Sequence, residues 1–310
     1  MPKSQMSTLT EDMFKPVDKD IDKSEKIVRP SLTYWADAWR RLKENKLALF
    51  SLGLLFLIII MAFLGPKIRP FGYSEQDFTL INKGPTSVHW FGTDALGRDI
   101  FVRCWEGAKV SLFIGFISAL INITIGIIYG GISGYLGGYV DVIMMRIVEI
   151  IYSIPELLWV ILLMLVMGQG LSTIIVAISI SGWGGMARLV RGQVLQLKQM
   201  EFVLAAKTLG ASSSRIILKH LIPNAMGPII INLTFQVPSA IFTEAFLSYI
   251  GLGVPAPLAS WGTLANEGTL TLLTYPYQLL FPALLISVTM LAFNILGDGI
   301  RDALDPKLRK

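Results

Sequence analysis

Residues 47–64 read LALFSLGLLFLIIIMAFL, eighteen residues in succession without a charged side chain. At about 1.5 Å per residue, a helix of this length spans roughly 27 Å, close to the ~30 Å hydrocarbon core of a bilayer. A buried helix of a large soluble protein explains one such run but not six. The sequence therefore predicts an all-α polytopic membrane protein with about six transmembrane helices. The five further apolar runs lie at about 110–132, 144–167, 171–183, 229–250 and 279–296.

The composition of the whole chain agrees with this class. Of the 310 residues, 53% are hydrophobic and 16% are charged, whereas a soluble domain has about 25% charged residues. The one cysteine, Cys104, can form no internal disulfide, and two histidines, His89 and His220, are too few for a histidine-rich metal site. These numbers exclude an ordinary soluble enzyme and a disulfide-stapled secreted module, and we expect no metal site.

The positive charge is concentrated in one segment. Residues 184–225 hold six Lys/Arg and one acidic residue, whereas residues 1–46, 65–109 and 298–310 are each nearly balanced. Six spans place both termini and the 184–225 loop on the same side, and the positive-inside rule makes that side the cytoplasm. The basic excess thus reports membrane orientation and requires no nucleic-acid partner.

These patterns divide the chain into consecutive parts. We expect a cytoplasmic tail with a pre-membrane helix (1–46), a first transmembrane helix (47–64), an extracellular segment (65–109), a five-helix core (110–297) that contains the cytoplasmic loop 184–225, and a cytoplasmic C-terminus (298–310). The first 30 residues read as a polar, charge-balanced tail.

A stripe of small or polar residues runs through the second apolar run. Residues four apart lie on one helix face, and small side chains there allow a neighbouring helix to approach closely. Packing inside the chain and an interface with another subunit both fit this stripe. Its members are Ser118, Asn122, Gly126, Gly130, Gly134 and Gly138.

Two carboxylates lie inside apolar runs. Glu156 follows Pro155 in the third run, where a kink would free backbone groups, and Glu244 follows Thr243 in the fifth. A charge at mid-bilayer is costly unless it faces protein or water, so both residues are candidates for lining a translocation path. The alternative is a carboxylate nearer the membrane edge. Arg146 and Glu149, three residues apart, are expected to form a structural pair.

Catalytic motifs are missing from the chain. It has no G-x-x-x-x-G-K-[ST] phosphate loop and no H-E-x-x-H, C-x-x-C or G-x-S-x-G motif. We therefore expect no catalytic residues and no ATP hydrolysis by this chain itself, and the missing motifs also weaken the case for a protease or a redox protein.

The most informative part of the basic loop is residues 201–223, EFVLAAKTLGASSSRIILKHLIP. This pattern predicts a short helix over 202–209 stopped by Gly210, and a second helix capped within 212–214 and closed before Pro223. Two short helices joined by small residues would suit a groove on a cytoplasmic partner. The alternative is an amphipathic hairpin lying on anionic lipid.

The same stretch resembles the E-A-A-x-x-x-G…I-x-L-P loop of prokaryotic ABC importer permeases. Four residues match at the family spacing, namely Ala205, Ala206, Gly210 and Pro223. Three positions depart from it, with Leu204 in place of Glu, His220 in place of Ile and Ile222 in place of Leu. The resemblance implies a coupling loop seated in an ATP-binding subunit. Its candidate contacts are Glu201, Leu204, Ala205, Ala206, Lys207, Gly210, Ala211, Arg215 and Pro223.

Three other stretches resemble C-type permeases of oligopeptide and dipeptide importers, with a type I ABC importer fold. They are 89–99 (HWFGTDALGRD), 247–262 (LSYIGLGVPAPLASWG) and 294–306 (NILGDGIRDALDP). The resemblance implies a peptide substrate and a multi-pass subunit in the plasma membrane of a bacterium. It also implies a second homologous permease, two cytoplasmic ATPases that bind ATP and Mg²⁺, and an extracellular substrate-binding protein. No cofactor is expected in this chain.

Other functions remain open at this point. Related permeases carry nickel or metal chelates, and a membrane scaffold or an ion-driven transporter using Glu156 and Glu244 would also contain such spans. In the predicted outer loop, Trp261, Asn266 and Glu267 are candidates for contact with the binding protein. The alternative for these three is packing of the loop against the span ends.

Overall fold

A computed structural model describes residues 34–305, so the predicted tail 1–30 and the last five residues lie outside the described part. The chain divides into two compact units, the first of which ends at Asp37. Every contact described below lies within the second unit, from Ala38 onward. The helices are α2 (Tyr34–Glu44), α3 (Lys46–Ile68), α4 (Ile100–Leu136), α5 (Gly138–Ser153), α6 (Glu156–Met167), α7 (Leu171–Leu197), α8 (Glu201–Thr208), α9 (Ser213–Ile216), α10 (Ile222–Tyr249), α11 (Trp261–Leu270) and α12 (Tyr277–Leu304).

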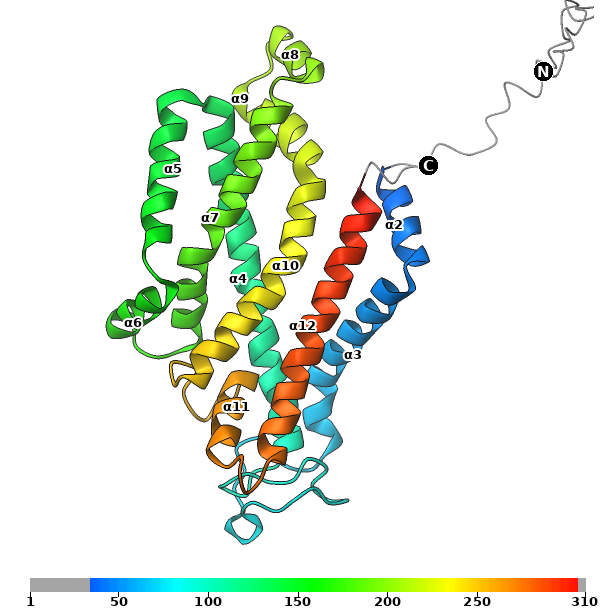
Figure 1. Cartoon of the computed structure of the whole chain (residues 1–310), viewed down its shortest axis with the longest axis vertical. Coiled ribbons are helices and arrows are strands. Elements are labelled where there is room, and N and C mark those ends of the chain that lie inside the picture. Colours follow the sequence, from blue (N-terminus) through cyan, green and yellow to red (C-terminus); the bar gives the residue numbers. More distant parts are fainter. Residues whose placement is uncertain (1–33, 306–310) are drawn as a thin grey trace, which may run out of the picture. The chain divides into compact units, whose positions relative to one another are not determined.

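The membrane spans agree with the predicted number. Five helical segments are long and apolar enough to cross a bilayer, and α5 with α6 forms a sixth if this pair, bent by 83°, counts as one span. In Figure 1 α5 begins where α4 ends and α7 runs back toward that same end, which is the arrangement expected of one broken span. The bend lies at Ile154 and Pro155, which confirms the kink predicted at Pro155.

Several helices are longer than the apolar runs from which they were predicted. α4 begins at Ile100, inside the segment predicted as extracellular, because Asp99 caps it by accepting a hydrogen bond from the Val102 amide (2.9 Å). Its 37 residues span about 55 Å, more than a bilayer needs. α12 likewise continues to Leu304, into the predicted 298–310 tail. Hydropathy marks the part of a helix in lipid, whereas caps set its ends.

The small-residue stripe of α4 packs against α7 within the chain. A Cβ atom added to Gly130 would lie 2.3 Å from the carbonyl oxygen of Ala187, and one added to Gly126 would lie 2.5 Å from the Met186 side chain. Gly134 faces Val194 and the Arg191 carbonyl in the same way. For these glycines of α4 the structure supports packing inside the chain, whereas Gly138, predicted as part of the stripe, begins α5, and a Cβ atom added there would meet no atom of the described residues within 4 Å.

Figure 1 shows α3 and α12 side by side, with α11 and the segment before α4 at one end and α8 with α9 at the other. We call these the α11 end and the hairpin end. At the α11 end, the buried Trp261 indole donates to the Cys104 carbonyl (2.9 Å) and joins α11 to α4. At the hairpin end, Arg191 of α7 makes two hydrogen bonds to Asp141 of α5 (2.5 and 2.6 Å). Both ends of the bundle are therefore tied by polar contacts.

Two adjacent glycines allow a matched test of the α4–α7 contact. Gly130→Ala is expected to destabilise the protein by about 1–3 kcal/mol, since the new methyl group overlaps the α7 backbone. Gly131→Ala has ordinary contacts, at 3.5 Å or more, and should be neutral or slightly stabilising because alanine favours helix. Thermal unfolding of the purified variants measures the difference. Equal midpoints for the two would contradict the packing described here.

Candidate functional sites

The 201–223 hairpin is the first candidate site. α8 ends before Gly210, whose φ of +79° is a left-handed conformation that favours glycine. The Ser212 hydroxyl then accepts from the Arg215 amide and caps α9. The predicted stop at Gly210 and the cap within 212–214 are therefore confirmed.

The predicted end of the second helix before Pro223 is wrong. After α9 the helix continues through a π-helical turn, η3 (Ile217–Leu221), directly into α10. Pro223 lies where η3 passes into α10, and because it has no N–H it cannot donate a hydrogen bond to the preceding helical turn. The Asn224 side chain donates a hydrogen bond to the His220 carbonyl (2.6 Å) across this junction. The hairpin is thus joined to a membrane span by an unbroken helix.

The hairpin has a buried face and an exposed apolar edge. Val203 and Ile216 are buried in a cluster with residues of α4, α7 and α10, and Ala206 is buried as well. Leu204, Leu209 and Leu218 are 65%, 87% and 67% exposed. Unpaired apolar side chains clustered in this way are typical of a docking surface. The other predicted contact residues that are exposed are Glu201, Ala205, Lys207, Gly210, Arg215 and Pro223, whereas Ala211 is half-buried.

The second candidate site is a cavity of about 490 Å³ between the α5–α6 bend, α7 and α10. Glu156 lines it and accepts a hydrogen bond from the Ser181 hydroxyl (3.1 Å). Most of its remaining polar groups come from one strip of α10, where the Gln236 amide donates to Asn232 (2.9 Å). The polar lining residues besides Glu156 and Tyr152 are Asn122, Ser181, Asn232, Gln236, Ser239 and Thr243. Polar side chains are thus gathered around a cavity between helices.

Sequence reasoning missed the α10 strip. Residues 232, 236, 239 and 243 recur at intervals of four, three and four, which places them on one face of a helix. This spacing of polar residues inside an apolar run was the available signal.

Glu244, the other candidate path residue, lies elsewhere. Its side chain is fully buried, and its carboxylate oxygens accept hydrogen bonds from Ser111 (2.9 Å) and Ser248 (2.7 Å). It does not line the 490 Å³ cavity. Because Ser111 also accepts from the Trp261 amide (3.1 Å), the carboxylate joins α4, α10 and the start of α11. The structure therefore gives Glu244 a packing position inside the chain.

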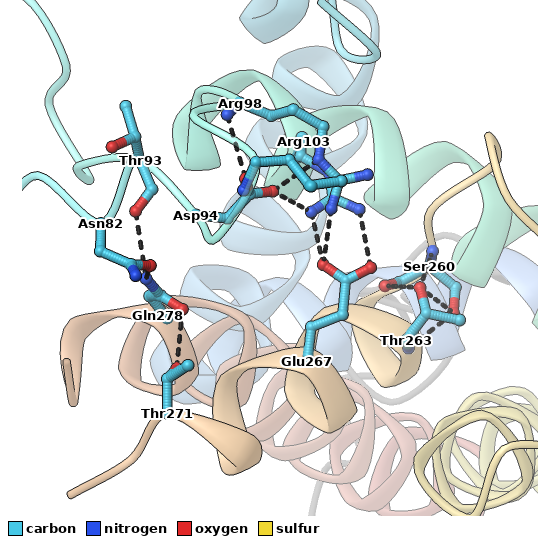
Figure 2. Close-up of polar contacts among 11 residues, drawn as sticks. Asn82, Thr93, Asp94, Arg98, Arg103, Ser260, Thr263, Glu267, Thr271 and Gln278 are labelled. Carbon is cyan, nitrogen blue, oxygen red and sulfur yellow. Dashed lines mark hydrogen bonds and ion pairs between the residues drawn. The ribbon is translucent and has the colours of Figure 1, made fainter. Parts of the chain in front are cut away.

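At the α11 end, a cluster of four charged residues connects α11, the start of α4 and the segment before α4. In Figure 2, Arg98 and Arg103 both reach Asp94 and Glu267. Arg103 is 2% exposed, and it contacts Glu267 through both terminal nitrogens (2.5 and 3.1 Å). Such bidentate pairs fix orientation as well as adding energy. We call Asp94, Arg98, Arg103 and Glu267 the Arg103 cluster.

A neutral network extends from this cluster to α12. The Gln278 amide donates to Asn82 (2.8 Å) and to the Thr93 carbonyl (3.2 Å), and its oxygen accepts from Thr271 (2.7 Å). Nearby, the Thr79 hydroxyl and amide hold the pKa of the exposed Asp77 below its usual range. The segment before α4 is thus fastened to α4, α11 and α12 by hydrogen bonds.

The residues of 89–99 have structural positions that explain their types. Gly92 and Gly97 have φ values of +80° and +72°, and a Cβ on Gly97 would lie 1.8 Å from the Asp77 carbonyl oxygen. His89 Nδ1 donates to Asp99 (2.8 Å), the residue that caps α4. The 89–99 motif, which resembles that of the peptide permeases, therefore forms the turn that leads into α4.

The predictions for contact with a binding protein require a correction. Trp261 is fully buried under α4, because its indole completes a hydrogen bond and fills the core, so its side chain offers no contact surface. Asn266 donates to the Tyr249 carbonyl. Glu267 is held by the Arg103 cluster with its side chain 42% exposed. Among the described residues, no group of three or more His, Cys, Asp or Glu side chains is placed to hold a metal ion.

Comparison with known proteins decides the family. Residues 105–310 match the family described as the inner membrane component of binding-protein-dependent transport systems. The chain belongs to this family. Residues 33–85 match the N-terminal transmembrane domain of oligopeptide transport permease C. These matches and the apolar helices make the chain a multi-pass inner membrane protein.

Two relatives match this permease subunit nearly end to end. It is 55% identical over 305 residues, 98% of this chain and 100% of the relative, to the oligopeptide transport system permease protein OppC of Bacillus subtilis (strain 168). It is 57% identical over 288 residues, 93% of this chain and 90% of the relative, to the dipeptide transport system permease protein DppC of the same organism. A chain of the MetNI methionine ABC transporter, solved in inward-facing conformations, shares the fold with a TM-score of 0.54 at 18% identity, covering 64% of this chain and 94% of that one.

Proposed function

We propose that this permease subunit is one of two transmembrane chains of an ATP-driven importer of oligopeptides or dipeptides. The observation that carries the proposal is the end-to-end likeness to relatives named as peptide permeases, at 55% and 57% identity. Peptides are also favoured over nickel by the polar cavity, whose described lining contains one carboxylate and no histidine. The second chain would be a homologous permease that closes the open side of this cavity.

The proposed orientation of the chain in the membrane follows from the distribution of its Lys and Arg residues. The 184–225 segment, predicted as a loop, runs from the second half of α7 through the hairpin because α7 continues to Leu197. It holds six Lys/Arg and one acid, whereas residues 251–278 hold no Lys or Arg. By the positive-inside rule the hairpin end and both termini face the cytoplasm, and the α11 end faces the exterior. A substrate-binding protein would then approach the α11 end.

ATP hydrolysis belongs to partner subunits in this proposal. The sequence has no phosphate loop, and the hairpin presents exposed leucines that suit a cleft in a cytoplasmic ATPase. ATP and Mg²⁺ would be bound there and not by this chain. The unbroken helix from α9 through η3 to α10 is suited to carry motion of the ATPase into the membrane, because a rigid element moves as one body.

Reconstitution tests the proposal. The transporter is purified through a tag on this chain and placed in vesicles with the binding protein outside and ATP inside. We expect uptake of a labelled tetrapeptide that stops without ATP and is inhibited by unlabelled peptides of two to six residues. Uptake driven by an ion gradient alone would identify an ion-driven transporter. Transport of free nickel without peptide would support the metal alternative, and stable ATPase binding without any transport would support a scaffold.

A further inference from the structure

The cavity between the α5–α6 bend, α7 and α10 contains polar groups that the chain leaves without partners. Within the described part of the chain, one oxygen of Glu156 accepts from Ser181 and the other accepts no hydrogen bond. The side-chain carbonyls of Asn122 and Gln236 are buried without a partner. Leaving buried acceptors unpaired costs stability, so an occupant that donates hydrogen bonds would be favoured.

Asn122 is built into this site by the residue opposite it. A Cβ atom on Gly182 would lie 2.1 Å from the Asn122 amide nitrogen. The Asn122 amide can therefore occupy this position only because residue 182 has no side chain. Asn122 is 4% exposed and lines the cavity. The side-chain carbonyl of Asn122 is thus buried without a hydrogen-bond donor among the described residues, which indicates that a bound ligand, rather than bulk solvent, supplies the donor.

The α10 strip gives the site its length. From Asn232 to Thr243 is eleven residues, which is about 16 Å along a helix and roughly the length of five residues of extended chain. Side-chain amides such as Asn232 and Gln236 can both donate and accept, as an extended peptide backbone does. The strip therefore suits a short peptide lying along α10.

The charge of the site selects one end of that peptide. Glu156 is the one carboxylate among the described lining residues, and no Lys, Arg or His joins it there. Among the described residues no ion pair joins Glu156 to a cation, and Arg188 of α7 lies over the ring of Tyr152 at 4.6 Å instead. A carboxylate without a cationic partner favours an ammonium group.

We propose that Glu156, together with Ser181 and Asn122, binds the N-terminal ammonium of the translocated peptide, while the α10 strip binds its backbone. This inference rests on the proposed function, because it names the substrate group that the peptide path recognises. A lysine side chain offers the same ammonium chemistry, so the test below separates the two sources.

The test is photolabelling of the assembled transporter. One tetrapeptide without Lys or Arg carries a diazirine on its first residue, and another carries it on its last. In the wild type we expect the first-residue probe to label the α5–α6 bend and α7 near Ser181, and the last-residue probe to label other positions. Glu156→Gln should lower first-residue labelling about tenfold, since a charge-assisted hydrogen bond is lost. Ser181→Ala should give an intermediate loss.

Glu149→Gln is the matched control. Glu149 lies on α5, pairs with the exposed Arg146 (2.6 Å) and does not line the cavity, so labelling should not change. An N-acetylated peptide with one lysine beside the probe should be labelled weakly, and labelling equal to that of the free peptide would overturn the N-terminal assignment. Each variant is used only if it copurifies with its ATPases.

Two different failures can be distinguished. If Glu156→Gln and Ser181→Ala both keep wild-type labelling while wild-type uptake remains ATP-dependent, this inference is overturned and the proposed function stands. If the wild-type transporter takes up no peptide with ATP, the proposed function itself fails, and the inference fails with it.

Discussion

Replacing Ala205 by aspartate is expected to abolish ATP-driven uptake in reconstituted vesicles while the chain still inserts and folds. Ala205 lies on the exposed side of α8, between Leu204 and the exposed Leu209, whereas its neighbour Ala206 is buried. An unpaired charge placed in an interface that excludes water costs about 2 kcal/mol or more, roughly thirtyfold in affinity. The measurement is peptide uptake together with the amount of ATPase that copurifies.

Leu204→Glu is the control for this experiment. It adds the same charge one residue away on the same exposed face, at the position where the resembling importer loops carry glutamate. We expect it to keep uptake near the wild-type level although it removes one exposed leucine, because the resembling loops dock with a glutamate at this position. A loss confined to Ala205→Asp then reports docking geometry rather than charge alone. Normal uptake by well-expressed Ala205→Asp transporter would mean that the hairpin does not dock through this face.

The membrane spans were predictable because hydropathy and helical period act locally. The run at 47–64 and the proline at 155 each carry their structural consequence in adjacent residues, and the structure contains the helix Lys46–Ile68 and the 83° bend. The helix ends were less predictable. α4 begins at Ile100 because of the Asp99 cap, and hydropathy is blind to a cap outside the bilayer.

The partners of each face were not predictable from spacing alone. The glycine stripe of α4 indicates close packing, but Gly130 faces Ala187 of α7 because of the tertiary fold, 57 residues further along the chain. The position of Trp261 was also not predictable from spacing. An aromatic residue in a predicted loop can belong to a contact surface or to a core, and in the structure Trp261 is buried in the core. Glu156 and Glu244 looked equivalent in sequence, yet one lines the cavity and the other is enclosed by serines.

The Arg103 cluster had no local signal at all. Arg103 and Glu267 are 164 residues apart, and only the fold brings them together. Charged residues in segments flanking a span are usually read as solvated, and here one of them is nearly fully buried. This cluster determines how α11 sits on the start of α4, and so it shapes the surface of the α11 end.

Replacing Arg103 by alanine is expected to cause the largest loss of stability of any single change at the α11 end. Arg103 is buried between Asp94 and Glu267, and its removal leaves both carboxylates to the one remaining cation, Arg98, among the described residues of the cluster. Removing one member of a buried ion pair costs about 3–5 kcal/mol, and we expect the lower end of this range because Arg98 still contacts both carboxylates and the Glu267 side chain is 42% exposed. Thermal unfolding of the purified transporter measures this loss.

Arg98→Ala provides the comparison, because Arg98 contacts the same two carboxylates (2.7 and 3.1 Å). In that variant Arg103 keeps its bidentate contact with Glu267 and its contact with Asp94, so we expect a smaller loss, about 1.5–3 kcal/mol. The loss of stability in Arg103→Lys should fall between those of the two alanine variants, since lysine keeps the charge but loses the planar fork.

If Arg98→Ala and Arg103→Ala lowered the unfolding midpoint equally, the buried arginine would not be the centre of the cluster. The double variant should lose less than the sum of the two single losses if both arginines neutralise the same carboxylates.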